Sequence, residues 1–522
     1  MRIAAIDIGS NSIRQTVADV SATGSIRVVD EMKAAPRLGA GIHETGRLTT
    51  HSMAAALAAL KRMSALAKQL GAKRRRVVAT SAVREAINGA EWLALVRKEA
   101  GMRVSVLDGH DEARLSFLSA LAHFDLGSGR AVVVDIGGGS LELALSADGL
   151  VERLISLPFG AIRLTEKYFS KGITPSAMRK LRRAVRKRLK DELPARDWTG
   201  AQLIGSGGTF TNLGGMVLAR HGIQTARTLH GTRVARVELE HIVDTLSALS
   251  PAERIAVPGL NPGRADIITA GLAAIAEVLA RFEAKEIVVS GYGIREGILL
   301  ELANVTPKPA DPGEARERSV RQLAARSHFE EPHARHVQRL ALRLFDSIGS
   351  RLGCAPEERQ LLADAALLHD IGYHINYDKH HKHSYHLITH AELLGMTPVE
   401  QVVIANIARY HRGAEPKRSH NNFGPLSAAS RERVTRLAAI LRVADGFDRG
   451  HAGAVEDIRV RWLERAIRLT AVPSPKASSV RLELWGASKK SWLLADYAGV
   501  PVEIVAPGGA IFTHEDDGTP AD

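Results

Sequence analysis

The chain repeats one pattern of apolar and polar positions. Residues 2–12 (RIAAIDIGSNS) and 130–140 (RAVVVDIGGGS) each contain an apolar run, an aspartate and then a turn of glycine and serine. A short apolar run bounded by turn residues is typical of a buried strand. A third run, residues 202–204, leads into the turn GSGGT at 205–209. The repetition predicts a duplicated domain with three similar junctions between a strand and a turn.

Around these junctions, apolar runs alternate with segments of helical periodicity. Residues 1–124 predict three strands and then alternating helices and strands, with one helix from His51 to Leu70. Residues 125–304 restart with the second copy, and they end in the strand EIVVSGYG and the helix IREGILLELA. Such alternation predicts two successive domains of the α/β class.

After residue 304 the pattern changes. A polar, proline-bearing stretch from Val305 to Arg318 predicts a linker, and apolar stripes with helical spacing predict an all-α domain over 305–450. The segments IRVRW, AIRLTAV, SVRLELW and VEIVA alternate with period two, which predicts a small sheet-containing domain over 451–522. Its last residues, HEDDGTPAD, are predicted to be disordered.

Composition narrows the class of protein. A chain of 522 residues, 45% of them hydrophobic and 24% charged, is long enough for three or four globular domains. The single cysteine, Cys354, excludes an internal disulfide and suits a reducing compartment. The sequence contains neither an apolar stretch of the ~20 residues that a membrane helix needs nor a leader pattern. We therefore expect a cytoplasmic protein without a membrane partner.

The charge of the chain predicts an anionic partner. Its formal net charge is +13, and its pI is near 9.9. Aromatic residues make up only 4% of the chain and are not interleaved with the basic ones, which disfavours nucleic acid. The densest basic run, from Arg179 to Lys190, forms either a solvated helix or a guide for a polyanion.

The three glycine turns predict phosphate chemistry. Glycine permits close approach of the backbone to an anion, and successive N–H groups form a concave anion site. The aspartates cannot themselves hold a phosphate, because like charges repel, but they can hold a divalent cation that does. The sequence therefore predicts a duplicated fold that closes on a metal-bound phosphate.

Seven motifs occur in one order along the chain: DIGSNS, TSAVREA, DEARLSF, DIGGGSLEL, PFGAIRLTE, GSGGT and NPGRADII. In this order they resemble the exopolyphosphatase and guanosine pentaphosphate phosphatase (Ppx/GppA) family over residues 1–304. The helical part is similar to the C-terminal extension of that family. The resemblance implies actin-like, ribonuclease-H-like α/β domains over 1–124 and 125–304. An all-α HD-like domain over 305–450 and a small α+β domain over 451–522 would follow.

The resemblance assigns the catalytic base to Glu112, the second acid of DEARL. This chain has Asp111 where the family usually has a first glutamate, and the shorter side chain leaves Glu112 the better candidate. A different interpretation of Glu112 is an acid at a helix start, where the helix dipole favours it.

Beside this base, a metal and a phosphate site are expected. Asp135 would hold Mg²⁺ or Mn²⁺, and Glu142 would orient the metal or water unless it is merely an exposed acid on a strand. Arg84, Arg163 and Arg264 lie in the matching motifs, where guanidinium groups clamp phosphate oxygens; the alternative for each is a surface salt bridge. The remaining expected phosphate-binding residues are Asp7, Gly9, Ser10, Asn11, Ser12, Gly137, Gly138, Gly139, Ser140, Ser206, Gly207, Gly208 and Thr209.

The helical domain carries a second pattern of histidines and aspartates. The pattern includes the adjacent His369 and Asp370 in LLHDIG and a distant Asp445 in LRVADGFDR. It resembles the HD superfamily of metal-dependent phosphohydrolases, and this resemblance implies a second divalent metal. The alternative is a set of structural residues that hydrogen-bond to one another. His380, His381 and His383 would bind the phosphate chain or line a loop, and His411 projects from an apolar face. The implied metal ligands are His336, His369, Asp370 and Asp445.

The leading functional hypothesis is an exopolyphosphatase that removes terminal phosphate from inorganic polyphosphate with Mg²⁺ and Glu112. Hydrolysis of guanosine pentaphosphate to the tetraphosphate remains open, because the sequence does not separate the two substrates. An actin-like ATPase or kinase and a non-catalytic polyanion sensor are the hypotheses of other classes. We also expect the protein to form a homodimer.

Overall fold

The structure is a computed structural model that describes the chain to Phe512, apart from residues 23, 194–197, 224–227, 308–310 and 392. The segment predicted to be disordered, HEDDGTPAD, lies outside the described residues. In the described part, none of the helices combines the length and the apolar character needed to cross a membrane. Contacts divide the chain into two compact units: unit 1 is Met1–Arg220 with Leu229–Pro312, and unit 2 is His221–Thr228 with Gly313–Asp522.

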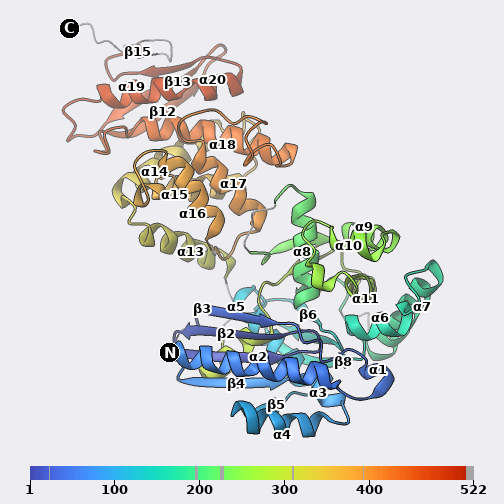
Figure 1. The fold of residues 1–522 in the computed structure, drawn as a ribbon. Coiled ribbons are helices and arrows are strands. Elements are labelled where there is room, and N and C mark those ends of the chain that lie inside the picture. Colours follow the sequence, from blue (N-terminus) through green and yellow to red (C-terminus); the bar gives the residue numbers. More distant parts are fainter. Residues whose placement is uncertain (23, 194–197, 224–227, 308–310, 392, 513–522) are drawn as a thin grey trace. The chain divides into compact units, whose positions relative to one another are not determined.

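Unit 1 begins with a five-stranded sheet in the order β3-β2-β1-β4-β5 (Figure 1). β1, β2 and β3 are antiparallel, whereas β4 and β5 run parallel to β1. Successive side chains of β1 point to opposite faces, so Ile6 and Ile8 pack under α2 and α4, while Ile3 and Ala5 pack under α5 and α12. The bounds are β1 Arg2–Ile8, β2 Ile13–Val20, β3 Ile26–Ala34, β4 Arg74–Ala79, β5 Val104–Val106, α2 Thr50–Gln69, α4 Gly89–Ala100, α5 Gly109–His123 and α12 Ile294–Leu302.

The second sheet of unit 1 has six strands in the order β10-β11-β9-β6-β7-β8. Its core is formed with α7, α8, α9 and α11. The bounds are β6 Arg130–Ile136, β7 Leu141–Ala147, β8 Leu150–Leu157, β9 Gln202–Ser206, β10 Thr232–Ala235, β11 Glu286–Val289, α6 Ala161–Phe169, α7 Pro175–Glu192, α8 Gly208–Arg220, α9 Arg236–Ala248 and α11 Ile268–Arg281. Shorter helical turns are α1 Ile42–Thr45, α3 Ser81–Glu85, α10 Pro251–Ile255 and η2 Pro262–Arg264.

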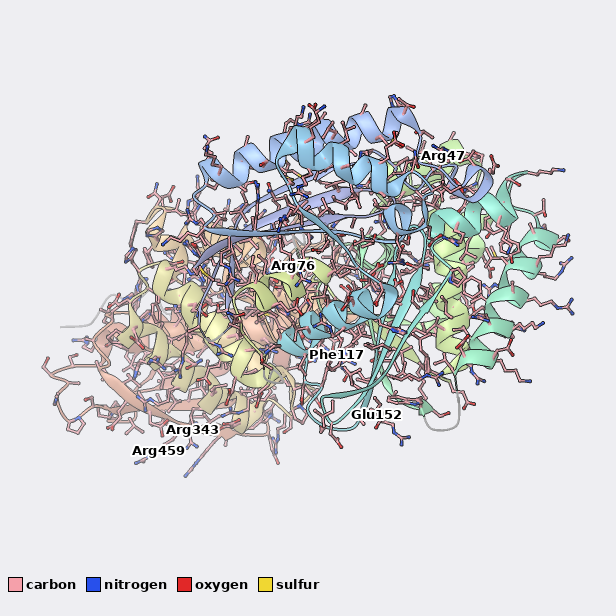
Figure 2. The ribbon with its side chains drawn as sticks, turned by 90° about the horizontal axis from the view of Figure 1, so that it is seen from below. Arg47, Arg76, Phe117, Glu152, Arg343 and Arg459 are labelled. Carbon is pink, nitrogen blue, oxygen red and sulfur yellow. The ribbon has the colours of Figure 1, made fainter. Side chains whose placement is uncertain are left out.

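The two sheets share one topology. The order β3-β2-β1-β4-β5 matches β8-β7-β6-β9-β11, and in each sheet an antiparallel hairpin starts the motif and parallel strands follow on its other side. The helix α5 links the two halves, and its Phe117, labelled in Figure 2, is buried with Val133 and Ile204 of the second sheet. The duplicated α/β fold predicted from the repeated phrase is therefore confirmed.

Unit 2 contains a group of helices followed by a four-stranded sheet in the order β12-β13-β14-β15 (Figure 1). The helices are α13 Pro312–Arg326, α14 Glu331–Ile348, α15 Glu358–Leu368, η3 Ile371–His374, α16 His380–His390, α17 Pro398–Arg409 and α18 Ala428–Gly446. The remaining elements are β12 Val455–Trp462, β13 Ile467–Pro473, α19 Arg481–Lys490, α20 Trp492–Ala498, β14 Val502–Val505 and β15 Ile511–Phe512.

Two segments differ from the sequence prediction. The expected linker from Val305 is shorter, because α13 begins at Pro312 and its Arg316 forms a buried ion pair with Asp364. The segment SVRLELW was predicted as a strand but lies mainly in α19, where Leu484 and Ala487 are buried at helical spacing. Alternation over a few residues also fits a single helical turn, so only packing distinguished the two structures.

The basic run from Arg179 to Lys190 lies in α7, which is not solvated on every side. Leu181, Val185 and Leu189 form a buried stripe. Arg186 on the same helix contacts the buried carboxylate of Glu277 with an Nε–Oε2 distance of 2.8 Å. Part of the basic charge is therefore neutralised by acids of the protein itself.

Candidate active site

The turns that follow β1 and β6 meet at one pocket of unit 1. Packing there is close: a Cβ atom built on Gly138 would lie 2.8 Å from Cβ of Ser10. The Ser10 hydroxyl is in turn 3.1 Å from the hydroxyl of Ser81, at the start of α3. Of the residues predicted from the sequence, the pocket is lined by Asp7, Gly9, Ser10, Asn11, Ser12, Glu112, Asp135, Gly137, Gly138, Ser140, Glu142, Gly207, Gly208 and Arg264.

The two turns have the same hydrogen-bonded geometry. The amide of Gly9 donates to the carbonyl of Ser12 at 3.1 Å, and the amide of Gly137 donates to the carbonyl of Ser140 at 3.0 Å. The duplication thus places Asp7 and Asp135, each two residues before its turn glycine, at corresponding positions of the pocket.

Four carboxylates share this pocket, and their pKa values are raised. Burial raises the pKa of Asp7 to about 6 against the opposing charge of Arg295. Burial also raises the pKa of Glu112 to about 7, although Arg84 opposes the shift. The pKa of Asp135 is raised by burial, and that of Glu142 is raised well above its usual value by burial and then by Glu112. Such clustering favours a bound cation.

The oxygens of this cluster fit a divalent metal ion. Asp7 Oδ1 is enclosed and has no hydrogen-bond partner among the described residues. Asp135 Oδ2 accepts from Ser116 Oγ at 2.8 Å. Gly207, with φ of +93°, leaves room for Asp135, because a Cβ there would lie 2.5 Å from Oδ1. Glu142 is buried, so its interpretation as an exposed strand acid is wrong. Mg²⁺ and Mn²⁺ both prefer such oxygen donors.

The Glu112 side chain is held by an arginine rather than used at the helix end. Asp108 is the N-cap of α5 and accepts from the amide of Asp111 at 2.8 Å. Glu112 forms a short ion pair with Arg84 Nη1, and the same guanidinium donates to the carbonyl of Leu107. Arg84 therefore positions Glu112 and does not line the pocket. Asp111 also lies outside the pocket lining and approaches Arg114.

Several predicted residues lie beside the pocket and not in its wall. Thr209 is fully buried and is 3.3 Å from Arg264 Nη1, and the Ser206 hydroxyl is 3.3 Å from Asp135 Oδ2. Gly139 and Arg163 line an adjoining pocket that also includes Ser10, Ser81 and Gly138. Arg163 is paired with Glu85 there. The alternative of a surface salt bridge is therefore found for Arg163, whereas Arg84 pairs with the buried Glu112.

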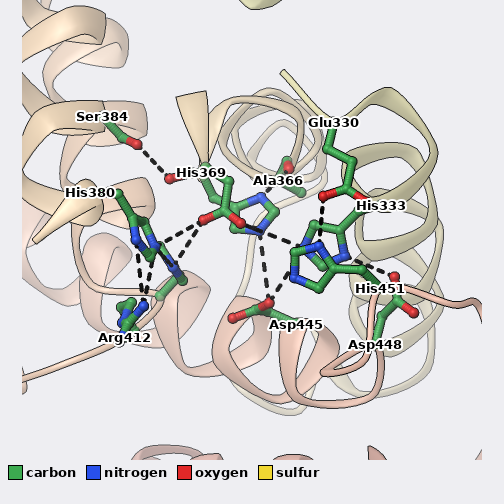
Figure 3. Close-up of polar contacts among 12 residues, drawn as sticks. Glu330, His333, Ala366, His369, His380, Ser384, Arg412, Asp445, Asp448 and His451 are labelled. Atoms are coloured by element: carbon green, nitrogen blue, oxygen red, sulfur yellow. Dashed lines mark hydrogen bonds and ion pairs between the residues drawn. The ribbon is translucent and has the colours of Figure 1, made fainter. Parts of the chain in front are cut away.

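In unit 2, His369, Asp370 and Asp445 meet in one cluster (Figure 3), but His336 does not join it. The Nε2 atom of His336 is 2.9 Å from the carbonyl of Val455, and its Nδ1 is 2.9 Å from Arg339 Nη2. His333, three residues earlier on α14, takes the expected place, with Nε2 3.6 Å from Asp370 Oδ2 and 3.7 Å from Asp445 Oδ1. The assignment of His336 is corrected accordingly, since both of its nitrogens already have partners.

The other histidines of unit 2 that the sequence analysis named divide into two sets. His380 and His411 lie within reach of Asp370. His381 and His383 are half-buried and belong to neither of the metal-compatible groups found in the described residues.

Comparison with known families identifies the relatives of the chain. The sequence profile of the Ppx/GppA phosphatase family matches residues 16–305, which is more than half of the chain. The chain belongs to this family. A second profile, that of Ppx/GppA phosphatase domain III, matches residues 315–475. The resemblance found from the seven motifs is confirmed, and the protein is a member of a family of phosphatases, which are hydrolases.

Solved structures of Ppx/GppA proteins are similar to this chain. The Aquifex aeolicus family member is 30% identical with a TM-score of 0.51, and the match covers 58% of this chain and 98% of that one. An exopolyphosphatase from Cytophaga hutchinsonii is 25% identical with a TM-score of 0.53, and the match covers 59% of this chain and 100% of that one. These similarities agree with the duplicated actin-like fold.

The Ppx/GppA pocket also contains residues that the sequence analysis missed. Arg14 and Arg295 line it, together with Thr80, Ser81 and Tyr292. Burial and then the charge of Arg295 lower the pKa of Arg14. The repeat itself contained the signal for Arg14, because this residue follows its aspartate by the same seven positions as Glu142 follows Asp135.

Proposed function

We propose that the protein is an exopolyphosphatase that hydrolyses the terminal phosphate of inorganic polyphosphate and releases orthophosphate. The observation that carries the proposal is the position of Glu112, a buried carboxylate in the pocket that both glycine turns line. Burial raises the pKa of this carboxylate to about 7. A carboxylate that titrates near neutral pH is suited to accept a proton from attacking water. The net charge of +13 suits a long anionic substrate, and the Cytophaga relative is named an exopolyphosphatase.

In this proposal different residues of the pocket bind the phosphate, stabilise its charge and accept the proton of the water. The serine hydroxyls and backbone of the two turns bind the terminal phosphate, and Arg14, Arg264 and Arg295 contact its oxygens. As charge develops on these oxygens, fixed cations stabilise it more than they stabilise the ground state. Arg84 holds Glu112 toward the pocket, where the carboxylate accepts the proton of the water.

Asp135 and Glu142 would hold Mg²⁺ or Mn²⁺, with Asp7 on the opposite turn. The ion supplies neutralisation of the phosphate charge when bound. The unpartnered Oδ1 of Asp7 in the described structure and the raised pKa values of all four acids support this assignment.

The test is a comparison of orthophosphate release from polyphosphate, guanosine pentaphosphate and ATP with Mg²⁺. We expect polyphosphate to have the highest kcat/KM. A preference for guanosine pentaphosphate would assign the other substrate of the family. Formation of an ATP-dependent product without polyphosphate turnover would indicate a kinase, and binding without any turnover would indicate a sensor.

A further inference from the structure

The helix α7 of unit 1 carries exposed cations that the proposed reaction does not use. Its buried stripe of Leu181, Val185 and Leu189 fixes which side of the helix faces the core. An α-helix has about 3.6 residues per turn, so positions 179, 180, 183, 187 and 190 lie on the side opposite this stripe. All of them are exposed and basic. We call these residues the α7 cation row: Arg179, Lys180, Arg183, Lys187 and Lys190.

The protein neutralises the cations on the flank of α7 but not those of the row. Arg182 contacts Glu240 with an Nη2–Oε2 distance of 2.6 Å. Arg186 contacts the buried Glu277 with an Nε–Oε2 distance of 2.8 Å. Among the residues that the structure describes, no acid forms an ion pair with a member of the row. The positive charge that α7 turns toward solvent is therefore not balanced by the chain.

Neighbouring members of the row repel one another. Lys180, Arg183 and Lys187 follow each other at separations of three and four positions, which places their side chains next to one another on the helix surface. Like charges at this spacing destabilise a helix. An anion bound along the row removes this repulsion.

The chemistry of the row suits a chain of phosphates. Lysine and arginine donate charged hydrogen bonds to phosphate oxygens. The helix contains no aromatic residue on which a nucleic-acid base could stack. From position 179 to position 190 the helix rises by about 16 Å, so one linear polyanion can contact several members of the row where a single small anion cannot.

The helix α6 connects this surface with the pocket of unit 1. The amide of Ala161 donates to the carbonyl of Gly137 at 2.9 Å, so α6 begins at the second glycine turn. The helix is about 13 Å long, and residues 170–174 join its end to α7, against which it packs (Figure 1). Lys167 on α6 and Lys171 in the connection are exposed. Basic side chains thus continue from the side of the pocket to α7.

We propose that the α7 cation row binds the distal part of an inorganic polyphosphate chain whose terminal phosphate lies in the pocket. This inference rests on the proposed function, because it concerns the same substrate. Contact at two places raises the affinity for long chains, since the second contact forms within one complex. Tripolyphosphate is shorter than α6 and gains nothing from the row.

The test is steady-state hydrolysis by the full-length protein and by a triple variant of α7: Lys180→Gln, Arg183→Gln and Lys187→Gln. At low salt we expect the KM for long-chain polyphosphate to rise by at least about 10-fold, while kcat and the KM for tripolyphosphate stay at the wild-type values. The wild-type KM for long chains should also rise about 20-fold more than that of the triple variant between about 50 and 200 mM salt, because three phosphate contacts are lost.

The matched control removes the same charge from another surface of unit 1. Its substitutions are Arg62→Gln, Lys68→Gln and Arg97→Gln, at exposed positions of α2 and α4. We expect the control to have the wild-type KM for long chains and the wild-type salt dependence. An equal rise of KM in the control and in the triple variant would reduce the effect to net charge and overturn the proposal.

A direct binding measurement separates this proposal from the proposed function. Fluorescently labelled long-chain polyphosphate is titrated with each full-length protein in EDTA, which prevents turnover that depends on a divalent metal. Weaker binding by the triple variant alone would support the row even if the wild type did not hydrolyse polyphosphate, a result that would refute only the proposed function. Equal binding by the triple variant and the control would overturn the row.

Two further measurements define what the row recognises. A single-stranded oligonucleotide that loses more affinity than polyphosphate in the triple variant would assign the row to nucleic acid and overturn the proposal. Circular dichroism checks each fold, and Arg183→Gln alone, with about a third of the effect on log KM, replaces a triple variant that unfolds. The variant that keeps the charge should bind long chains like the wild type: Lys180→Arg, Arg183→Lys and Lys187→Arg.

Discussion

Arg14 and Glu142 occupy the same position in the two copies of the repeated hairpin. Arg14 faces Asp7 across the β1–β2 pair, and Glu142 faces Asp135 across the β6–β7 pair at the corresponding register. Both line the same pocket of unit 1. The two copies therefore place different charges at corresponding positions of one pocket. The second copy supplies two carboxylates, Asp135 and Glu142, which suit a metal ion, whereas the first supplies Asp7 and Arg14.

Replacement of Arg14 is expected to weaken phosphate binding. Arg14→Met removes a cation that lines the pocket, and a charged hydrogen bond contributes about 1.5–3 kcal/mol, so kcat/KM for polyphosphate should fall about 10- to 150-fold. Arg27→Met is the control, since Arg27 lies exposed on β3 and pairs with Asp19. Equal kcat/KM values for the two variants would show that Arg14 does not contribute to phosphate binding.

The role of Glu112 is tested by Glu112→Gln, which keeps the size of the side chain but cannot accept the proton. We expect phosphate release to fall by about 10²- to 10⁴-fold while binding of polyphosphate is largely retained. Asp111→Asn is the neighbouring control and should remain near wild type, because Asp111 does not line the pocket. Turnover that survives in Glu112→Gln would mean that another group is the base.

Activity is expected to rise with pH through about 7, where Glu112 loses its proton. Arg84 lowers the pKa of Glu112, so Arg84→Gln should raise that pKa and move the acidic limb of the kcat/KM profile to higher pH. Arg163→Gln removes a guanidinium paired with Glu85 and should leave the limb in place. A profile unchanged by Arg84→Gln would contradict the assigned ion pair.

Mg²⁺ is expected to stabilise the protein more at pH 8 than at pH 6. The pKa values of Asp7 and Glu112 in the folded protein are raised to about 6 and about 7. The folded state therefore binds more protons than the unfolded chain between about pH 4 and these values, so the free energy of unfolding falls as the pH rises through this range. At pH 8 the ionised carboxylates repel, and a divalent cation offsets this. Thermal melting at both pH values measures the effect, and Asp135→Asn should reduce it. An equal Mg²⁺-induced shift of the melting temperature in the wild type and in Asp135→Asn would mean that the ion binds elsewhere.

The buried ion pair of Arg316 and Asp364 is expected to stabilise the helices of unit 2. Arg316→Met leaves the carboxylate of Asp364 buried without its main partner, which should lower the free energy of unfolding by about 3–5 kcal/mol. Arg321→Met, on the same helix, breaks an exposed pair with Glu317 and should cost at most about 0.5 kcal/mol. Urea unfolding followed by circular dichroism compares them, and equal losses would contradict the difference in burial.

The difference between His336 and His333 illustrates the limit of sequence reasoning. Both lie on α14, one helical turn apart, and either could face the interior by spacing alone. The contact of His336 with the carbonyl of Val455, 119 residues later in the chain, decided between them. The helix at SVRLELW has the same explanation, since only its packing showed which period the apolar residues follow.

The sequence by itself determined the duplicated α/β fold, the glycine turns and the membership of the Ppx/GppA family. These features are local: an apolar run, an aspartate and a turn are contiguous, and each copy can be recognised alone. Only the tertiary structure decided that Arg295 lines the pocket, that Arg84 holds Glu112, and that His333 rather than His336 faces Asp370. The physical reason is that these relationships depend on the register between strands and on contacts between distant segments, which no local pattern encodes.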